Sequence, residues 1–168
     1  MSYSALAVAN TFISMGKSDK IRGLTPMKLQ KLLFFSQLLY LVKKDEKLID
    51  AEFDRWKFGP VIPAIYELFS VYGRDSIDQQ AGVLVGDGDE LVLRAPVVDS
   101  GDNETIKFLG LIAERLGRYD AISLSNLSHA KGTAWAIGDP GTTITTEDLK
   151  NDVFFKRAKA KKMTEAPV

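Results

Sequence analysis

The stretch LTPMKLQKLLFFSQLLYLVKK at residues 24–44 and the stretch FDRWKFGPVIPAIYELFSVY at residues 53–72 hold most of the large apolar side chains. Thr25 followed by Pro26 predicts a helix start, because threonine caps free backbone N–H groups and proline loses nothing at the first helical position. The apolar residues that follow cover most of the helix circumference, which is typical of a helix at the centre of a core. We therefore expect the rest of the chain to pack around these two stretches.

Length and composition are those of an ordinary soluble domain, with 168 residues, of which 45% are hydrophobic and 26% charged. The 22 basic residues balance the 22 acidic ones, so global charge favours neither nucleic acid nor a membrane. The absence of cysteine excludes disulfides and cysteine-ligated zinc and fits a reducing compartment. No secretory signal is visible, and we expect a cytoplasmic protein. Residues 1–160 are expected to form one domain, and residues 161–168 a flexible tail.

Local patterns predict the remaining elements. Helices are expected at Ser4–Met15 (ending at Gly16), Pro63–Tyr72 (ended by Gly73), Asp102–Leu116, Ser123–His129 (capped by Ser123), and Glu147 to about Lys159 (opened by a capping box of Thr145 and Asp148). Residues 52–58 predict a short strand before a turn at 58–60. The glycine–aspartate turn within Gly82–Leu93 predicts a β-hairpin, which we expect to dock on the helices because isolated hairpins are marginal. The expected fold class is mainly α: a compact helical domain with a small β-hairpin or short β-element packed on it.

The chain offers little chemistry for catalysis. One histidine and no cysteine exclude a cysteine nucleophile and any site that needs two histidines. No G-x-S-x-G elbow presents a serine nucleophile. The acidic run at Asp87, Asp89 and Glu90 lacks the spacing of a calcium loop and predicts a solvated turn. We expect a non-enzymatic protein with no catalytic residues, no metal and no cofactor; a bound metal or a reactive serine would contradict this.

Two further features have a structural and a functional interpretation. His129 lies near a predicted helix C-terminus, where the dipole favours a histidine bonded to a carbonyl; alternatively it contacts or orients a partner together with Trp135. The basic C-terminal end fits a helix C-terminus with a solvated tail, or the nucleic-acid contact of a regulator. Its residues are Lys156, Arg157, Lys159, Lys161 and Lys162.

The segment around Gly59 combines aromatic residues with a turn that proline stiffens. Arg55 and Lys57 alternate with the aromatics, which predicts that one face of the segment is polar and exposed. Exposed aromatics beside arginine are typical of protein interfaces, but core packing around a rigid corner explains the same group equally well. The group consists of Trp56, Phe58, Pro60 and Tyr66.

Three motifs resemble, in order and spacing, the signatures of the Panacea antitoxin domain family, which includes SocA-like antitoxins and phage-associated GepA-like proteins. They are LTPMKLQKLL at residues 24–33, WKFGPVIP at residues 56–63, and LSNLSHAKGTAW at residues 124–135. The resemblance covers roughly residues 5–155. One departure is Ala134, which stands where a proline often precedes the tryptophan.

The resemblance implies a mostly helical antitoxin of a two-gene toxin–antitoxin system. Such a protein binds a cognate protein toxin that the neighbouring gene encodes, or acts as a proteolytic adaptor that delivers the toxin to a ClpXP-type protease, or does both. On this basis we expect no nucleic-acid or membrane partner, and the oligomeric state stays open. The expected partner-binding residues are Trp56, Phe58, Gly59, Pro60, Val61, Pro63, Tyr66, His129 and Trp135. Three alternatives remain: the motifs only hold the fold together, the protein binds a host factor for a phage or mobile element, or it is a nucleic-acid-binding regulator.

Overall fold

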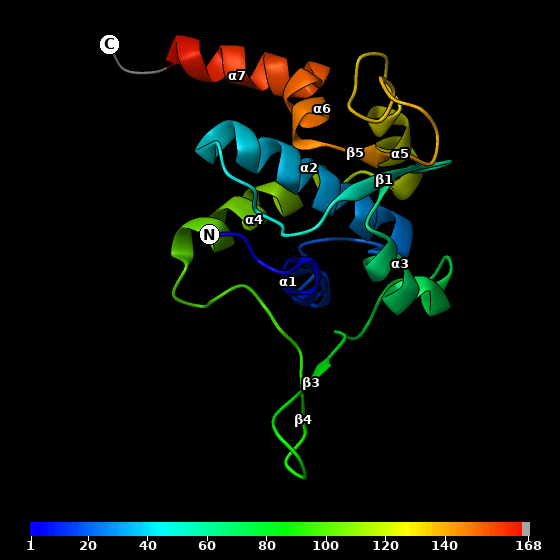
Figure 1. Ribbon diagram of the computed structural model, residues 1–168, viewed down its shortest axis with the longest axis vertical. Coiled ribbons are helices and arrows are strands. Elements are labelled where there is room, and N and C mark those ends of the chain that lie inside the picture. Colours follow the sequence, from blue (N-terminus) through cyan, green and yellow to red (C-terminus); the bar gives the residue numbers. More distant parts are fainter. Residues whose placement is uncertain (166–168) are drawn as a thin grey trace.

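Helix α2 (Pro26–Lys44) runs through the centre of the computed structural model, which describes residues 1–165 (Figure 1). It begins as predicted, because the Thr25 side chain accepts a hydrogen bond from the Lys28 amide and Pro26 takes the first helical position. Its side chains are buried around most of the circumference. The helices in contact with it are α1 (Ala5–Lys17), α3 (Pro63–Phe69), α4 (Asn103–Leu116), α5 (Ala121–Ser128) and α7 (Val153–Glu165). The mainly α fold class is thus confirmed.

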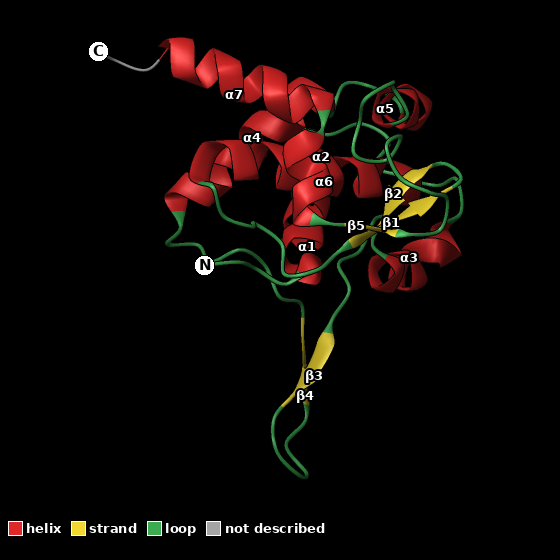
Figure 2. Ribbon diagram, turned by 45° about the horizontal axis from the view of Figure 1, so that its top comes forward, coloured by secondary structure: helices red, strands yellow, loops and turns green. Residues whose placement is uncertain are grey.

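A small antiparallel sheet lies beside the helices (Figure 2). Its strands are β1 (Phe53–Trp56), β2 (Gly59–Val61) and β5 (Thr143–Ile144), in the order β2-β1-β5. The expected strand forms, but it ends at Trp56. Trp56 pairs with Gly59, so the turn lies at Lys57 and Phe58, and Gly59 and Pro60, which were expected in the turn, belong to β2. The 3₁₀ turn η1 (Ser70–Tyr72) extends α3 as far as Gly73.

Buried amide side chains on α2 hold the crossing main chain. The Oε1 atom of Gln37 accepts hydrogen bonds from the amides of Leu48 and Ile49, at 3.0 and 2.9 Å. Gln30 accepts from the Ile62 amide at 2.8 Å and donates to the Ile62 carbonyl at 3.2 Å. These contacts satisfy the buried amides of Leu48, Ile49 and Ile62, and the pair of bonds from Gln30 holds Ile62, the N-cap residue of α3, against α2.

The predicted hairpin forms, from β3 (Val83–Val85) and β4 (Val92–Arg94), but the expectation that it docks on the helices is wrong. It projects from the body (Figures 1 and 2), and Leu84 and Leu93 are 65% and 68% exposed. Its stem is held by the fully buried Asn10, whose amide donates to the carbonyls of Ala81 and Pro96. Polar contacts therefore anchor the base of the hairpin, and the apolar side chains on both of its faces lie away from the core.

Several helix ends differ from the sequence expectation. Helix α1 continues through Gly16 to Lys17. Helix α5 is capped by Asp120 and not by Ser123, whose amide instead donates to the Asp120 carboxylate. A carboxylate at this position accepts a stronger hydrogen bond than a hydroxyl does, and its negative charge is attracted to the positive end of the helix dipole.

The expected last helix is two helices, α6 (Thr146–Asn151) and α7. The predicted capping box of Thr145 and Asp148 opens α6. Asp152 then takes an extended conformation, and its buried carboxylate accepts from the amides of Ala134 and Phe154, so the chain turns there. Helix α7 includes residues 161–165 of the expected flexible tail, and residues 166–168 lie outside the described residues. None of the helices within residues 1–165 has both the length and the apolar content needed to cross a bilayer.

Candidate partner-binding surface

The three sequence motifs meet at Gly59. This glycine has φ +114°, a conformation that other residues rarely adopt. A Cβ atom there would lie 2.6 Å from Oγ of Ser128 and 2.7 Å from Cε of Lys31, so only glycine allows α2, β2 and α5 to approach this closely. One residue of each motif thus contributes to a single contact.

Lys31 lies beneath this contact with a side chain that is only 1% exposed. Its ammonium donates to the carbonyl of Pro60 at 3.2 Å. Burial lowers the pKa of Lys31 to about 7, because a low-dielectric surrounding disfavours the charged form. The family motif therefore places an amine of unusually low basicity under the β1–β2 turn.

The β1–β2 turn is fixed from α5. Ser125 donates its hydroxyl to the carbonyl of Phe58 at 2.7 Å, and Ser128 donates to the carbonyl of Ser125 at 2.7 Å. With the main chain held in this way, the Phe58 ring stays 57% exposed at the tip of the turn. Lys57 lies with its Nζ atom 5.5 Å from the centre of that ring.

The two tryptophans are joined by a hydrogen bond and flanked by other rings. Trp135 donates its indole N–H to the carbonyl of Trp56 at 2.8 Å. The rings of Trp56 and Tyr66 meet edge to face at 5.0 Å, and the rings of His129 and Trp135 are 4.0 Å apart. The expected pairing of His129 with Trp135 is therefore present.

His129 forms the C-cap of α5, as its predicted place at a helix C-terminus requires. Within residues 1–165, the expected hydrogen bond from this histidine to a carbonyl is not found at its Nε2 atom. Burial, followed by the charge of Lys31, lowers the pKa of His129, and its Nε2 atom has no hydrogen-bond partner among the described residues. The imidazole ring lies against the ring of Trp135, tilted by 32° from its plane.

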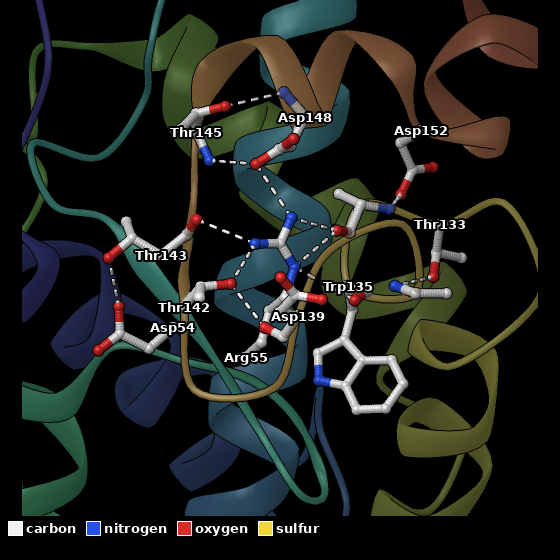
Figure 3. Close-up of polar contacts among 12 residues, drawn as sticks. Asp54, Arg55, Thr133, Trp135, Asp139, Thr142, Thr143, Thr145, Asp148 and Asp152 are labelled. Atoms are coloured by element: carbon white, nitrogen blue, oxygen red, sulfur yellow. Dashed lines mark hydrogen bonds and ion pairs between the residues drawn. The ribbon is translucent and has the colours of Figure 1, made fainter.

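Arg55 is buried, at 4% exposure, which corrects the expectation that it belongs to an exposed polar face. Figure 3 shows its guanidinium among oxygen atoms from the loop after α5 and from α6. It donates to the carbonyls of Ala134, Trp135 and Thr143, the hydroxyl of Thr142, and the carboxylate of Asp148. A Cβ atom at Gly138 would lie 2.1 Å from Cζ of Arg55, so glycine is needed there for the loop to close over the guanidinium.

The nine residues predicted to bind a partner divide by exposure. Phe58 and Tyr66 are 57% and 44% exposed. The half-buried members are Trp56, Pro63, His129 and Trp135, and the buried members are Gly59, Pro60 and Val61. The structure brings all of them into one region, where the buried members support the turn and the exposed aromatics face solvent.

Two grooves flank the Phe58 ring. One has a volume of about 880 Å³ and includes Met27, Ile122 and His129 in its lining; the other, of about 560 Å³, includes Lys31, Trp56 and Tyr66. Lys57 and Arg74 line both. Sequence reasoning did not identify Met27, Arg74 or Ile122. The helix predicted at Ser123–His129 leaves Ile122 out, and only tertiary packing brings these three residues together.

Among residues 1–165, no group of three or more His, Cys, Asp or Glu side chains is arranged to hold a metal ion. Besides the aromatic rings, the polar side chains that line the grooves are Thr25, Gln30, Lys31, Lys57, Arg74, Ser125, Asn126 and His129. The Ser125 hydroxyl donates to the Phe58 carbonyl and not to His129, so the two do not form the pair that activates a serine nucleophile. The arrangement fits recognition of another molecule through apolar contact and positive charge.

Comparison with known proteins agrees with the motifs. The family model described as "Antitoxin SocA-like, Panacea domain" matches residues 29–136, which include Lys31, the β1–β2 turn and the His129–Trp135 stack. The antitoxin SocA of Caulobacter vibrioides (strain NA1000 / CB15N) is 34% identical over 148 residues, covering 85% of this chain and 75% of that relative. No solved structure shows significant similarity to the chain. A match over more than half of the sequence, centred on the contact that joins all three motifs, establishes that the chain belongs to the SocA-like, Panacea-domain family of antitoxins.

Proposed function

We propose that the protein neutralises a cognate protein toxin by binding it directly across the surface around Phe58. The observation that carries this proposal is the exposure of the Phe58 ring on a turn whose main chain is held by α5 and whose flanks are grooved. An aromatic side chain on a rigid support loses little conformational entropy when a partner covers it, which favours association. Tyr66 extends the same exposed aromatic surface onto α3.

The test uses the product of the neighbouring gene, co-expressed with the antitoxin. Phe58→Ala and Tyr66→Ala remove exposed ring surface, and Tyr66→Ala also removes the edge-to-face contact with Trp56, so thermal unfolding checks that both variants fold. Leu111→Ala is the matched control, because Leu111 is 48% exposed on α4 and lies outside both grooves. Growth rescue and toxin affinity are expected to fall for the first two variants only. Folded Phe58 and Tyr66 variants that still neutralise the toxin would exclude this surface.

Neutralisation has two forms, occlusion of the toxin and delivery of the toxin to a ClpXP-type protease. The antitoxin family supports a toxin partner, and the adaptor form is carried over from the resemblance to SocA-like proteins. Measuring the half-life of the toxin with and without the protease separates the forms. A short half-life that needs both antitoxin and protease indicates delivery, whereas a long-lived inactive complex indicates occlusion.

The other interpretations have separate tests. A nucleic-acid-binding regulator needs the basic C-terminal end, so removing residues 156–168 would abolish a salt-sensitive DNA shift. In the described part of that end, Lys162 donates to the carbonyls of Val42 and Lys43, which gives it a structural role. A phage or mobile-element protein would bind a host factor through the surface around Phe58 and would have no adjacent toxin gene.

A further inference from the structure

The surface around Phe58 is cationic as well as apolar. Lys57 and Arg74 line both grooves, and both side chains are exposed. No aspartate or glutamate of the described residues lines either groove. In a chain whose basic and acidic residues balance at 22 each, this local excess of positive charge is not a consequence of composition.

Lys31 adds a third amine at the floor of the smaller groove. Its ammonium has three N–H donors, and its one hydrogen-bond acceptor among the described residues is the carbonyl of Pro60. Burial disfavours the charged form of this amine, so a negative group brought into the groove beside it would stabilise that form. His129 lines the other groove with an Nε2 atom that has no partner among the described residues.

The apolar side chains select among anionic partners. Phe58 and Ile122 are 57% and 70% exposed, and Met27 and Val61 line the grooves on either side of Phe58. Apolar side chains of this kind suit the leucine or phenylalanine side chains of a peptide and give no hydrogen bond or charge contact to a phosphate backbone. Positive charge around an apolar centre thus matches a peptide that carries carboxylates beside apolar residues.

We propose that the two grooves bind an acidic amphipathic segment of the toxin, with its apolar side chains against Phe58 and Ile122 and its carboxylates near Lys57, Arg74 and Lys31. This inference rests on the proposed function, since it names the chemistry of the toxin segment that the same surface binds. The carboxylates supply the negative charge that the grooves lack, and the apolar residues cover the exposed ring.

The first measurement compares binding of the neighbouring-gene toxin to the wild type and to two charge-reversed variants. Lys57→Glu with Arg74→Glu reverses the groove charge. Lys107→Glu with Arg115→Glu makes the same charge change at exposed positions on α4. We expect the groove variant to lose about tenfold or more in affinity and to lose the salt dependence of binding, while the α4 variant changes little. Thermal unfolding checks that both variants fold.

The second measurement uses defined probes with the full-length wild-type protein. Two fluorescein-labelled helical peptides share the same leucine and phenylalanine positions and carry either glutamate or lysine at the others. We expect the glutamate peptide to bind and to be displaced by the toxin. Tighter binding of the lysine peptide would overturn the inference. Displacement of the toxin by a single-stranded oligonucleotide, lost in the groove variant, would also overturn it and favour nucleic acid.

The outcomes separate the two proposals. One possible result is that the wild type binds the toxin, that Phe58→Ala abolishes this binding, and that the charge-reversed groove variant keeps full affinity. This result would exclude the acidic segment and leave direct neutralisation standing. If the wild type binds no neighbouring toxin, the proposed function itself fails. If the groove variant loses binding of the toxin and of the glutamate peptide, and the α4 variant keeps both, the result supports both proposals.

Discussion

The indole N–H of Trp135 donates to the carbonyl of Trp56 at 2.8 Å across a sequence separation of 79 residues. This bond joins the β1–β2 turn to the loop that follows α5, and it does so at the edge of the exposed surface around Phe58. It also positions the ring of Trp135 against His129, 4.0 Å away. The Trp135 side chain therefore joins two segments that are distant in sequence and also contributes to the shape of the candidate binding surface.

Trp135→Phe keeps an aromatic ring but removes the donor. We expect the free energy of unfolding to fall by about 1 kcal/mol, since a hydrogen bond of this kind contributes roughly that amount and the Trp56 carbonyl loses a partner. Urea unfolding followed by circular dichroism measures the change. An unchanged midpoint would mean that water replaces the indole without loss.

Gly59→Ala introduces a methyl group at φ +114°, against Ser128 and Lys31. We expect a loss of roughly 2 kcal/mol or more, because the backbone strain and the clash with a buried side chain add. Gly110→Ala is the control, since Gly110 lies within α4 with nothing within 4 Å of its added Cβ atom. That change should stabilise the helix by about 0.5–1 kcal/mol, so the two variants should differ in sign.

Arg55→Lys retains the positive charge and tests the geometry of the guanidinium. Lysine cannot reach carbonyls at residues 134, 135 and 143 together with Thr142 and Asp148, so buried acceptors lose their partners. We expect a loss of about 3 kcal/mol in thermal or urea unfolding. Arg115→Lys on the exposed face of α4 should be neutral. Equal stability of both variants would show that charge alone suffices at residue 55.

Burial lowers the pKa of Lys31 in the folded protein to about 7, from the ordinary lysine value of 10.5. Between these values the unfolded chain binds more protons than the folded one, so this residue makes stability rise as pH rises from about 7 to about 10, on the order of 4 kcal/mol in total. Lys31→Met removes that contribution. We expect the stability difference between variant and wild type to be largest near neutral pH and to shrink toward about pH 10. Lys28, whose pKa burial also lowers, is present in both proteins and cancels from the comparison. A difference independent of pH would contradict the assignment.

Asn10 holds the stem of the projecting hairpin through bonds of 2.8 Å to the Ala81 carbonyl, 2.8 Å to the Pro96 carbonyl and 3.0 Å from the Ala81 amide. Asn10→Ala leaves these half-buried backbone groups without their side-chain partner, and we expect a loss of roughly 2 kcal/mol. Hydrogen exchange should accelerate within residues 81–98 more than in α2. Asn103→Ala, at an exposed position on α4, is the control. Uniform acceleration across the protein would mean that the stem and the core unfold together.

The helix starts could be predicted because each depends on atoms only a few residues apart. Thr25 caps α2 through the Lys28 amide, and Thr145 with Asp148 forms the capping box of α6. The hairpin turn and the central place of α2 follow from equally local patterns of glycine, aspartate and apolar residues. Where the prediction failed, at Ser123 and at the break before α7, a neighbouring aspartate made the stronger cap.

By itself, therefore, the sequence determined the helical class, a strand followed by a turn near Gly59 and the motifs that mark the family, while the strand pairing moved the turn itself to residues 57–58. Only the tertiary structure decided that Arg55 and Lys31 are buried, that the hairpin projects, and that Met27, Arg74 and Ile122 share grooves with Phe58. The physical reason lies in the distance between partners along the chain. The acceptors of Arg55 at Ala134 and Asp148 are 79 and 93 residues away, and a cation can be buried only once folding has brought such oxygens around it.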